Sequence, residues 1–164
     1  MNERRDPDPQ QLSHVRADGT VAMVDVSGKS VTSREAVAAA TVQMSPVTIR
    51  LLRDKALPKG DVLTTARVAG ILAAKQASSL IPLTHPLPIT FIDIEFEIGD
   101  SSVEVTATTR CDGKTGVEIE AMTACAVACL TIYDMCKSAQ KDIVITDLRL
   151  LRKSGGKSGT FERG

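Results

Sequence analysis

Residues 92–108 have the sequence IDIEFEIGDSSVEVTAT, in which apolar and polar side chains alternate on both sides of Gly99-Asp100-Ser101. An alternation with a period of two is typical of a strand with one buried and one solvated face, and Gly, Asp and Ser favour turns. We therefore predict an antiparallel hairpin with strands at about residues 92–98 and 103–108.

A long helix is predicted directly after the hairpin, at about residues 117–140, where Ala, Cys, Ile and Val recur through VEIEAMTACAVACLTIYDMCKSAQ. A helix that is apolar on most sides is buried by its neighbours. Residues 143–151 then predict a last strand.

Three helices are predicted before the hairpin, each from an N-terminal capping signal. Thr32 and Glu35 form a T-x-x-E capping box in front of residues 36–44. Ser45-Pro46 and Asp61 supply the other two caps, which predict helices at about residues 46–55 and 62–77.

Helices, a hairpin, a further helix and a strand are the element order of an α+β fold. We predict an antiparallel sheet covered on one face by helices. Residues 1–18 are polar, contain two prolines and show no periodicity, which predicts a disordered N-terminal lead that includes His14. Residues 19–164 are then predicted to be a single domain that ends in a Gly-rich basic tail.

The composition argues against several classes of function. Lys and Arg number 20, as do Asp and Glu, so no overall charge attracts nucleic acid or a membrane surface. One Tyr, three Phe and no Trp leave few aromatic side chains for stacking on bases. No uninterrupted apolar run approaches the ~20 residues that span a membrane.

The four cysteines are expected to be buried, reduced thiols of a cytosolic protein. They have no C-x-x-C spacing, no histidine cluster lies near them, and no secretory leader precedes them. A tetrahedral zinc site is therefore not predicted, and no metal ligands are assigned.

The long helix carries the first candidate for chemistry. At 100° per residue, Asp134, Lys137 and Lys141 share one face, and Glu120 lies about 40° from Asp134. An exposed Asp–Lys pair that contributes a few tenths of a kcal/mol is the alternative. Charges on a helix that is otherwise buried need partners or a function, so Asp134 and Lys137 are candidates for acid–base catalysis.

A proline-rich loop carries the second candidate. Residues 80–88 read LIPLTHPLP, and three prolines in seven residues exclude regular structure. The loop holds His85 next to Thr84 in a rigid apolar setting. A histidine satisfied within a turn is the alternative interpretation.

Lysines in glycine-containing turns form the third candidate. Lys59 lies in a Pro-Lys-Gly turn, and Lys153 and Lys157 lie in KSGGKSG near the C-terminus. Exposed backbone N–H groups and lysines can bind phosphate oxygens, whereas a flexible solubilising tail is the alternative. A P-loop is excluded, because Leu151 stands where its first glycine is needed. Lysines beside other cations have a lowered pKa, which predicts a lysine base near neutral pH.

Six short motifs of this sequence occur in the order of one known family: Met23–Val26, Lys59–Asp61, Ile81–Pro86, Lys114–Ala121, Ile132–Lys137 and Leu150–Gly159. The chain resembles the molybdenum cofactor biosynthesis protein C family of cyclic pyranopterin monophosphate synthases over about residues 19–161.

The resemblance implies a ferredoxin-like fold and a cytoplasmic homohexamer, built as a trimer of dimers with sites between subunits. It implies a phosphorus–oxygen lyase that converts 3′,8-cyclo-7,8-dihydro-GTP to cyclic pyranopterin monophosphate and pyrophosphate. The substrate would come from a partner radical enzyme, and no organic cofactor is implied. Mg²⁺ with the triphosphate is compatible with this chemistry, although no ligand cluster in the sequence indicates it.

The resemblance also implies that residues 19–164 form one catalytic domain, and it implies roles for individual residues in it. The implied catalytic residues are Asp134, Lys137 and Lys59. The implied substrate-binding residues are Leu83, Thr84, His85, Glu118, Ile119, Glu120, Arg34 and Lys153, of which the last two are expected near the triphosphate.

Thr84 departs from the family, which usually has Cys at this position. A threonine keeps a small hydrogen-bonding side chain but lacks a thiol, so a binding role is expected and a thiolate role is not. A non-catalytic guanine-nucleotide or phosphate-binding paralogue of the same fold is the alternative. It predicts binding without turnover.

Overall fold

The computed structural model describes residues 19–164, so the prediction for residues 1–18 lies outside the described part of the chain. Its elements, in chain order, are β1 (Thr32–Gln43), α1 (Pro46–Arg53), α2 (Val62–Lys75), α3 (Ala77–Leu80), β2 (Ile89–Ile98), β3 (Ser102–Gly113), α4 (Glu118–Cys136), β4 (Val144–Ser154) and β5 (Phe161–Glu162).

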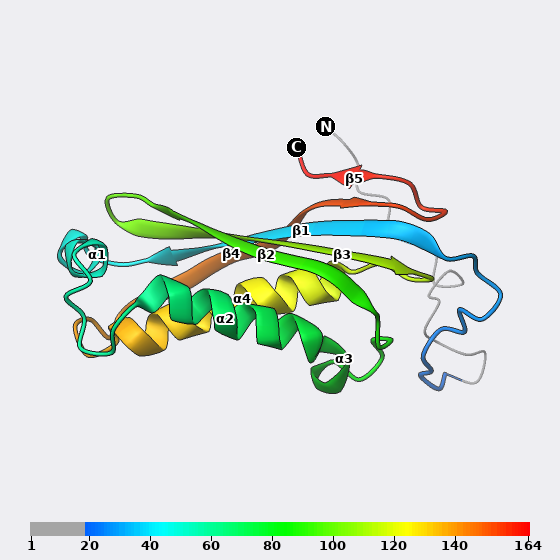
Figure 1. Ribbon diagram of the computed structural model, residues 1–164, viewed down its shortest axis with the longest axis horizontal. Helices are drawn as coiled ribbons and strands as arrows, with labels where there is room; N and C mark the ends of the chain where they lie inside the picture. The colour runs from blue at the N-terminus through cyan, green and yellow to red at the C-terminus, as the bar shows by residue number, and fades with distance from the viewer. Residues whose placement is uncertain (1–18) are drawn as a thin grey trace.

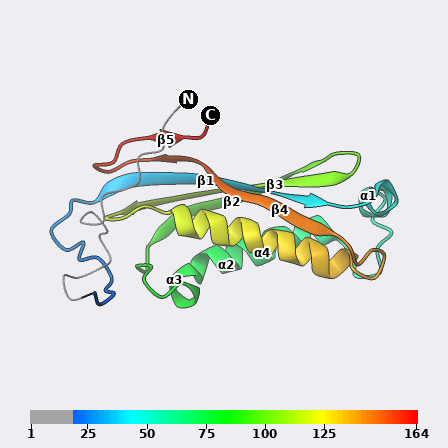
Figure 2. The ribbon, with the colours of Figure 1, turned by 180° about the vertical axis from the view of Figure 1, so that it is seen from behind.

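The strands form one antiparallel sheet in the order β2-β3-β1-β4-β5. Helices α2 and α4 lie side by side against the same face of this sheet (Figures 1 and 2). This confirms the predicted α+β class with helices on one face. Counting only the helices α2 and α4 that cover the sheet, the order through β4 is β-α-β-β-α-β, the order expected of a ferredoxin-like motif.

The predicted helix at residues 36–44 is wrong, because these residues belong to the central strand β1. Ala36, Ala38, Ala40 and Val42 are fully buried at every second position, and β1 pairs with both β3 and β4. Tertiary pairing overrides the helix propensity of alanine here. Small side chains also let α4 pack closely onto the sheet.

The supposed capping residue Glu35 has a different role in the strand. Its carboxylate forms ion pairs with Arg110 of β3 and Arg152 of β4. The side chain therefore ties three neighbouring strands together instead of capping a helix.

The other predicted elements are confirmed, with small changes in their ends. Ser45 caps α1 by accepting a hydrogen bond from the Thr48 N–H, and Asp61 caps α2 in the same way through the Thr64 N–H. Both helices end two residues before the predicted boundary, and α4 ends four residues before it. The hairpin strands are longer than predicted, and the short elements α3 and β5 were not predicted.

The core is built from small and branched apolar side chains, with all four cysteines free and buried in it. Burial raises the pKa of the Cys136 thiol to about 11, so it stays protonated at neutral pH.

Helix α2 approaches α4 closely at Gly70, where a Cβ would lie 2.8 Å from the Ala124 carbonyl oxygen. By length and composition alone α4 is apolar enough to cross a membrane, but half of the tested stretch is buried within the protein, as in a core helix.

Candidate active site

All three predicted catalytic residues meet at the C-terminal end of α4. The Asp134 carboxylate lies between two ammonium groups, with Lys59 Nζ 2.6 Å from Oδ2 and Lys137 Nζ 2.7 Å from Oδ1. Lys59 also donates to the Asp134 carbonyl oxygen at 3.0 Å. All three side chains are about half exposed, so a ligand can reach them.

Backbone geometry positions this cluster. Lys59 lies in the turn between α1 and α2, where Gly60 has a φ of +87°, a conformation that glycine adopts without strain. Asp134 and Lys137 lie in and just after the last turn of α4. The helix C-terminus carries partial negative charge, which favours the two lysines there.

The two lysines determine the charge state of Asp134. Hydrogen bonds from Lys137 and then Lys59 lower the pKa of Asp134 to about 2. The same carboxylate raises the pKa of Lys137 above its ordinary value. The predicted lowering of a lysine pKa is therefore wrong for Lys137, because a carboxylate stands between it and the nearest cation. In the free protein this pair is a carboxylate beside an ammonium group.

These shifts predict how the cluster stabilises the fold as the pH changes. The lowered pKa of Asp134 means that its contribution to folding stability is complete above its ordinary pKa of 3.8 and is lost as the pH falls toward about 2. The raised pKa of Lys137 means that its contribution to folding stability is complete below its ordinary pKa of 10.5 and is lost at higher pH. We expect the small difference in unfolding free energy between wild type and Asp134→Asn to be constant from about pH 5 to 9 and to shrink below about pH 4. Urea unfolding at each pH measures it, and a difference that grows in acid would contradict the assignment.

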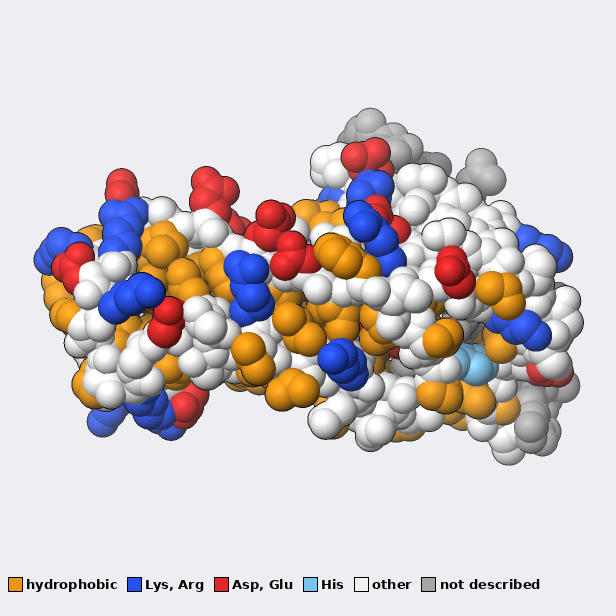
Figure 3. Space-filling model, in the orientation of Figure 1, with side chains coloured by type: hydrophobic (Ala, Val, Ile, Leu, Met, Phe, Trp, Pro, Cys, Tyr) orange, Lys and Arg blue, Asp and Glu red, His pale blue; other side chains and the backbone are white. Residues whose placement is uncertain are grey.

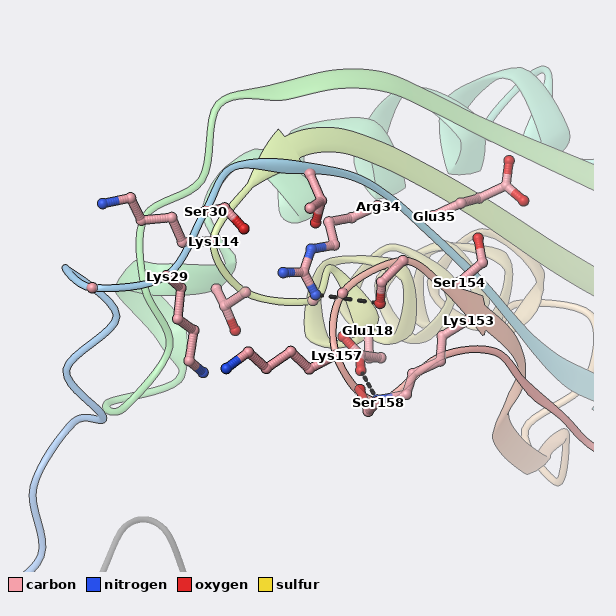
Figure 4. A pocket seen from close by; sticks show the side chains of 16 residues that line it. Lys29, Ser30, Arg34, Glu35, Lys114, Glu118, Lys153, Ser154, Lys157 and Ser158 are labelled. Atoms are coloured by element: carbon pink, nitrogen blue, oxygen red, sulfur yellow. Dashed lines mark hydrogen bonds and ion pairs between the residues drawn. The ribbon is translucent and has the colours of Figure 1, made fainter.

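A second set of predicted residues lines a cavity of about 750 Å³ near the N-terminal end of α4. Residues 28–35, 114–118 and 153–158 contribute to its wall (Figure 4). Its cationic side chains are Lys29, Arg34, Lys114, Lys153 and Lys157.

The C-terminal tail folds around Arg34. The guanidinium donates to the Gly113 carbonyl oxygen at 3.3 Å and to the Gly155 carbonyl oxygen at 3.4 Å. Gly155 and Gly156 have φ values of +95° and +77°, and a Cβ on Gly156 would lie 2.0 Å from an Arg34 nitrogen. These two glycines therefore allow the tail to wrap over the guanidinium.

The other cations differ in their partners. Lys153 pairs with Glu118 at 2.7 Å, and Lys114 donates to the Ser27 carbonyl oxygen at 2.7 Å. The side chains of Lys29 and Lys157 have no hydrogen bond or ion pair within the described residues, and they extend toward one another in Figure 4. Lys29 and Lys114 were not predicted as site residues, because a single lysine beside a glycine is too weak a signal.

The proline-rich loop lies at the same end of the molecule. His85 is half-buried, and its Nε2 is 2.8 Å from the Val24 carbonyl oxygen. Because a carbonyl only accepts, Nε2 carries a proton in this contact. Leu83 and Thr84 beside it are also half-buried.

Two residues of the first turn of α4 complete the predicted set. Ile119 is 38% exposed. Glu120 is only 2% exposed, and its Oε2 has no hydrogen-bond partner among the described residues. Burial raises the pKa of Glu120, and the Glu118 carboxylate raises it further. A carboxyl group that retains its proton can donate a hydrogen bond as well as accept one.

A single chain does not bring all these residues together. Glu118 and Asp134 are sixteen residues apart on α4, which places them roughly 24 Å apart at about 1.5 Å per residue. We call Asp134, Lys59 and Lys137 the acid–base cluster. We call the cavity that Lys153 lines near the N-terminal end of α4 the cationic cavity. Within residues 19–164 no group of three or more His, Cys, Asp or Glu side chains is placed to hold a metal ion.

Comparisons with known proteins agree on one family. The family model described as "MoaC family" matches residues 23–156. A cyclic pyranopterin monophosphate synthase of Nitratidesulfovibrio vulgaris is 56% identical over 152 residues, which cover 92% of this chain and 94% of that protein. A protein of the same name from Streptomyces coelicolor is 50% identical over 157 residues, with 95% and 92% covered.

Proposed function

We propose, since this chain belongs to the MoaC family, that it is a cyclic pyranopterin monophosphate synthase. The single observation that supports the chemistry best is the acid–base cluster. An ionised carboxylate held within 2.7 Å of two ammonium groups offers a proton acceptor and proton donors at one place.

The proposed reaction has 3′,8-cyclo-7,8-dihydro-GTP as its substrate and is that of a phosphorus–oxygen lyase. Rearrangement of the purine to a pyranopterin needs proton transfers, which Asp134, Lys137 and Lys59 supply. In the phosphate step a substrate hydroxyl attacks the α-phosphorus, and the bond from that phosphorus to the bridging oxygen breaks. Pyrophosphate leaves with the bridging oxygen, and the hydroxyl proton passes to a base.

The cationic cavity fits the triphosphate of this substrate. Positive side chains in this cavity would stabilise the negative charge that pyrophosphate gains as it leaves. They are those of Arg34, Lys153, Lys29 and Lys157. We propose that no organic cofactor takes part. Mg²⁺ bound to the triphosphate would add to this charge, and turnover measured with and without a chelator shows whether it is needed.

We further propose that the active site is shared between subunits of a cytoplasmic homohexamer, a trimer of dimers. The roughly 24 Å between the two clusters of one chain supports this, because one substrate must contact both. Apolar side chains on the outer side of the helices also support it. Val68 and Leu72 of α2 and Leu130 of α4 are more than half exposed. Figure 3 shows hydrophobic side chains at the surface in the region where α2 lies in Figure 1.

The purified protein tests the activity directly. It is incubated with 3′,8-cyclo-7,8-dihydro-GTP, and pyrophosphate and an oxidisable, fluorescent pterin are measured. We expect both products to appear together. A chain that binds the substrate and never releases pyrophosphate would instead be the non-catalytic phosphate-binding paralogue.

Thr84 gives a separate prediction about substrate binding. Thr84→Cys is expected to leave kcat within about twofold and to change KM by less than about fivefold, because a contact residue contributes mainly to binding. Steady-state kinetics at several pH values measures both constants. A large rise in kcat that follows ionisation of the new thiol would show that this position carries chemistry.

A further inference from the structure

Glu118 is an anion inside the cationic cavity. Its Oε1 lies 2.7 Å from Lys153 Nζ, and both side chains are largely covered, with 24% and 31% exposed (Figure 4). Among residues 19–164 one other acidic side chain lines the cavity, that of Glu35, which is already paired with arginines from β3 and β4. Glu118 is therefore the carboxylate that a bound anion meets.

The fold provides a defined place for the Glu118 carboxylate. A Cβ on Gly116 would lie 1.8 Å from Oε2 and 2.6 Å from Cδ, so the carboxylate occupies space that any other residue at position 116 would fill. Lys153 approaches from β4, whereas Glu118 is the first residue of α4. The pair thus depends on a glycine on one side and a lysine on the other.

An anion that binds to Lys153 must share or replace the Glu118 carboxylate. Like charges at close distance repel, and a lysine ammonium cannot serve two anions as well as one. In the free protein Glu118 already supplies the negative charge that a phosphate group would otherwise supply.

We propose that Glu118 competes with pyrophosphate for Lys153 and thereby speeds the release of this product. When pyrophosphate is bound, Lys153 pairs with it and Glu118 is displaced. When the Glu118–Lys153 pair forms again, pyrophosphate leaves. The proposal rests on the proposed function, which makes pyrophosphate the leaving group. It involves an exchange of ion-pair partners and no covalent step.

Binding of inorganic pyrophosphate to the full chain tests the proposal by calorimetry. Glu118→Gln is expected to tighten binding about tenfold, since it removes the competing charge and keeps the shape. Lys153→Met is expected to weaken binding. In the Lys153→Met background, Glu118→Gln should lose most of its effect, because the contested cation is gone.

Gly116→Ala provides a matched test in which no charge changes. Its Cβ displaces the Glu118 carboxylate from its place beside Lys153, so pyrophosphate binding should tighten in the same direction. Circular dichroism and thermal unfolding confirm that each variant is folded. Should Glu118→Gln fail to fold, Gly116→Ala still decides the question.

Several results would overturn the proposal. Weaker or unchanged pyrophosphate binding in both Glu118→Gln and Gly116→Ala would make Glu118 a ligand or a bystander. If Glu118→Gln tightened pyrophosphate binding equally with and without Lys153, the role of Glu118 would be only general charge repulsion. The absence of pyrophosphate binding in the wild type and in every variant would also overturn the proposal.

Turnover of the wild type separates this inference from the proposed function. Normal wild-type turnover without tighter pyrophosphate binding in the variants would contradict the competition for Lys153 and leave the proposed function intact. Tighter binding in the variants without any wild-type turnover defeats the proposed function, and with it the role in product release.

Discussion

Asp134→Asn is expected to lower kcat by about 10²–10⁴-fold and to leave substrate binding within roughly tenfold. The asparagine keeps the size of the side chain but cannot accept a proton, and it loses two ion pairs of 2.6 and 2.7 Å. Lys137→Ala should have a similar effect, because its ammonium group acts in the transition state. Single-turnover kinetics and equilibrium binding of the substrate separate the two quantities.

Two control variants share the same end of the molecule. Asp142 and Lys141 are exposed, and within residues 19–164 no hydrogen bond or ion pair joins their side chains to the acid–base cluster. Asp142→Asn and Lys141→Ala should therefore keep kcat near that of wild type. A large loss of binding with little loss of rate in Asp134→Asn would assign Asp134 to positioning of the substrate.

Asp134→Asn and Lys153→Met are each expected to have little turnover alone, and hybrid assemblies of the two are expected to regain about a quarter of wild-type turnover. Asp134→Asn has an intact cationic cavity, and Lys153→Met has an intact acid–base cluster. If each site takes one cluster from each of two chains, random mixing leaves about one site in four with both clusters intact. Co-expression of the two variants with different tags, followed by purification through both tags, yields the hybrids for assay.

The matched control is a hybrid of Asp134→Asn and Lys137→Ala. Both changes fall in the same cluster, so no site in this hybrid is intact and no activity should return. A first hybrid that remains as inactive as its parents would show that each site is formed within one chain.

The hairpin and the long helix could be predicted because their periodicity is local. Alternation at residues 92–98 and 103–108 requires no knowledge of the rest of the fold. Strand β1 could not be predicted in the same way, since Ala36, Ala38 and Ala40 suit a helix as well as a strand. Their conformation is decided by pairing with β3 and β4, which come far later in the chain.

The candidate site shows a similar division. The pairing of Asp134 with Lys137 follows from their spacing on one helix, and the structure adds Lys59 from a turn 75 residues earlier. The separation of Lys153 from this cluster follows from the direction of α4, which no motif encodes. Lys29 and Lys114 reach the cavity through the folding of residues 19–31 and the β3–α4 turn.

Because Glu118 and Asp134 lie at opposite ends of α4, the length of this helix is subject to a strict constraint in evolution. A deletion of one residue between Glu118 and Asp134 would rotate one end by about 100° relative to the other and shorten the span by about 1.5 Å. The turn at Gly99–Ser101 joins β2 and β3 and supplies no residue to either cluster. Insertions and deletions among homologous chains should therefore occur in that turn and be absent from residues 118–134.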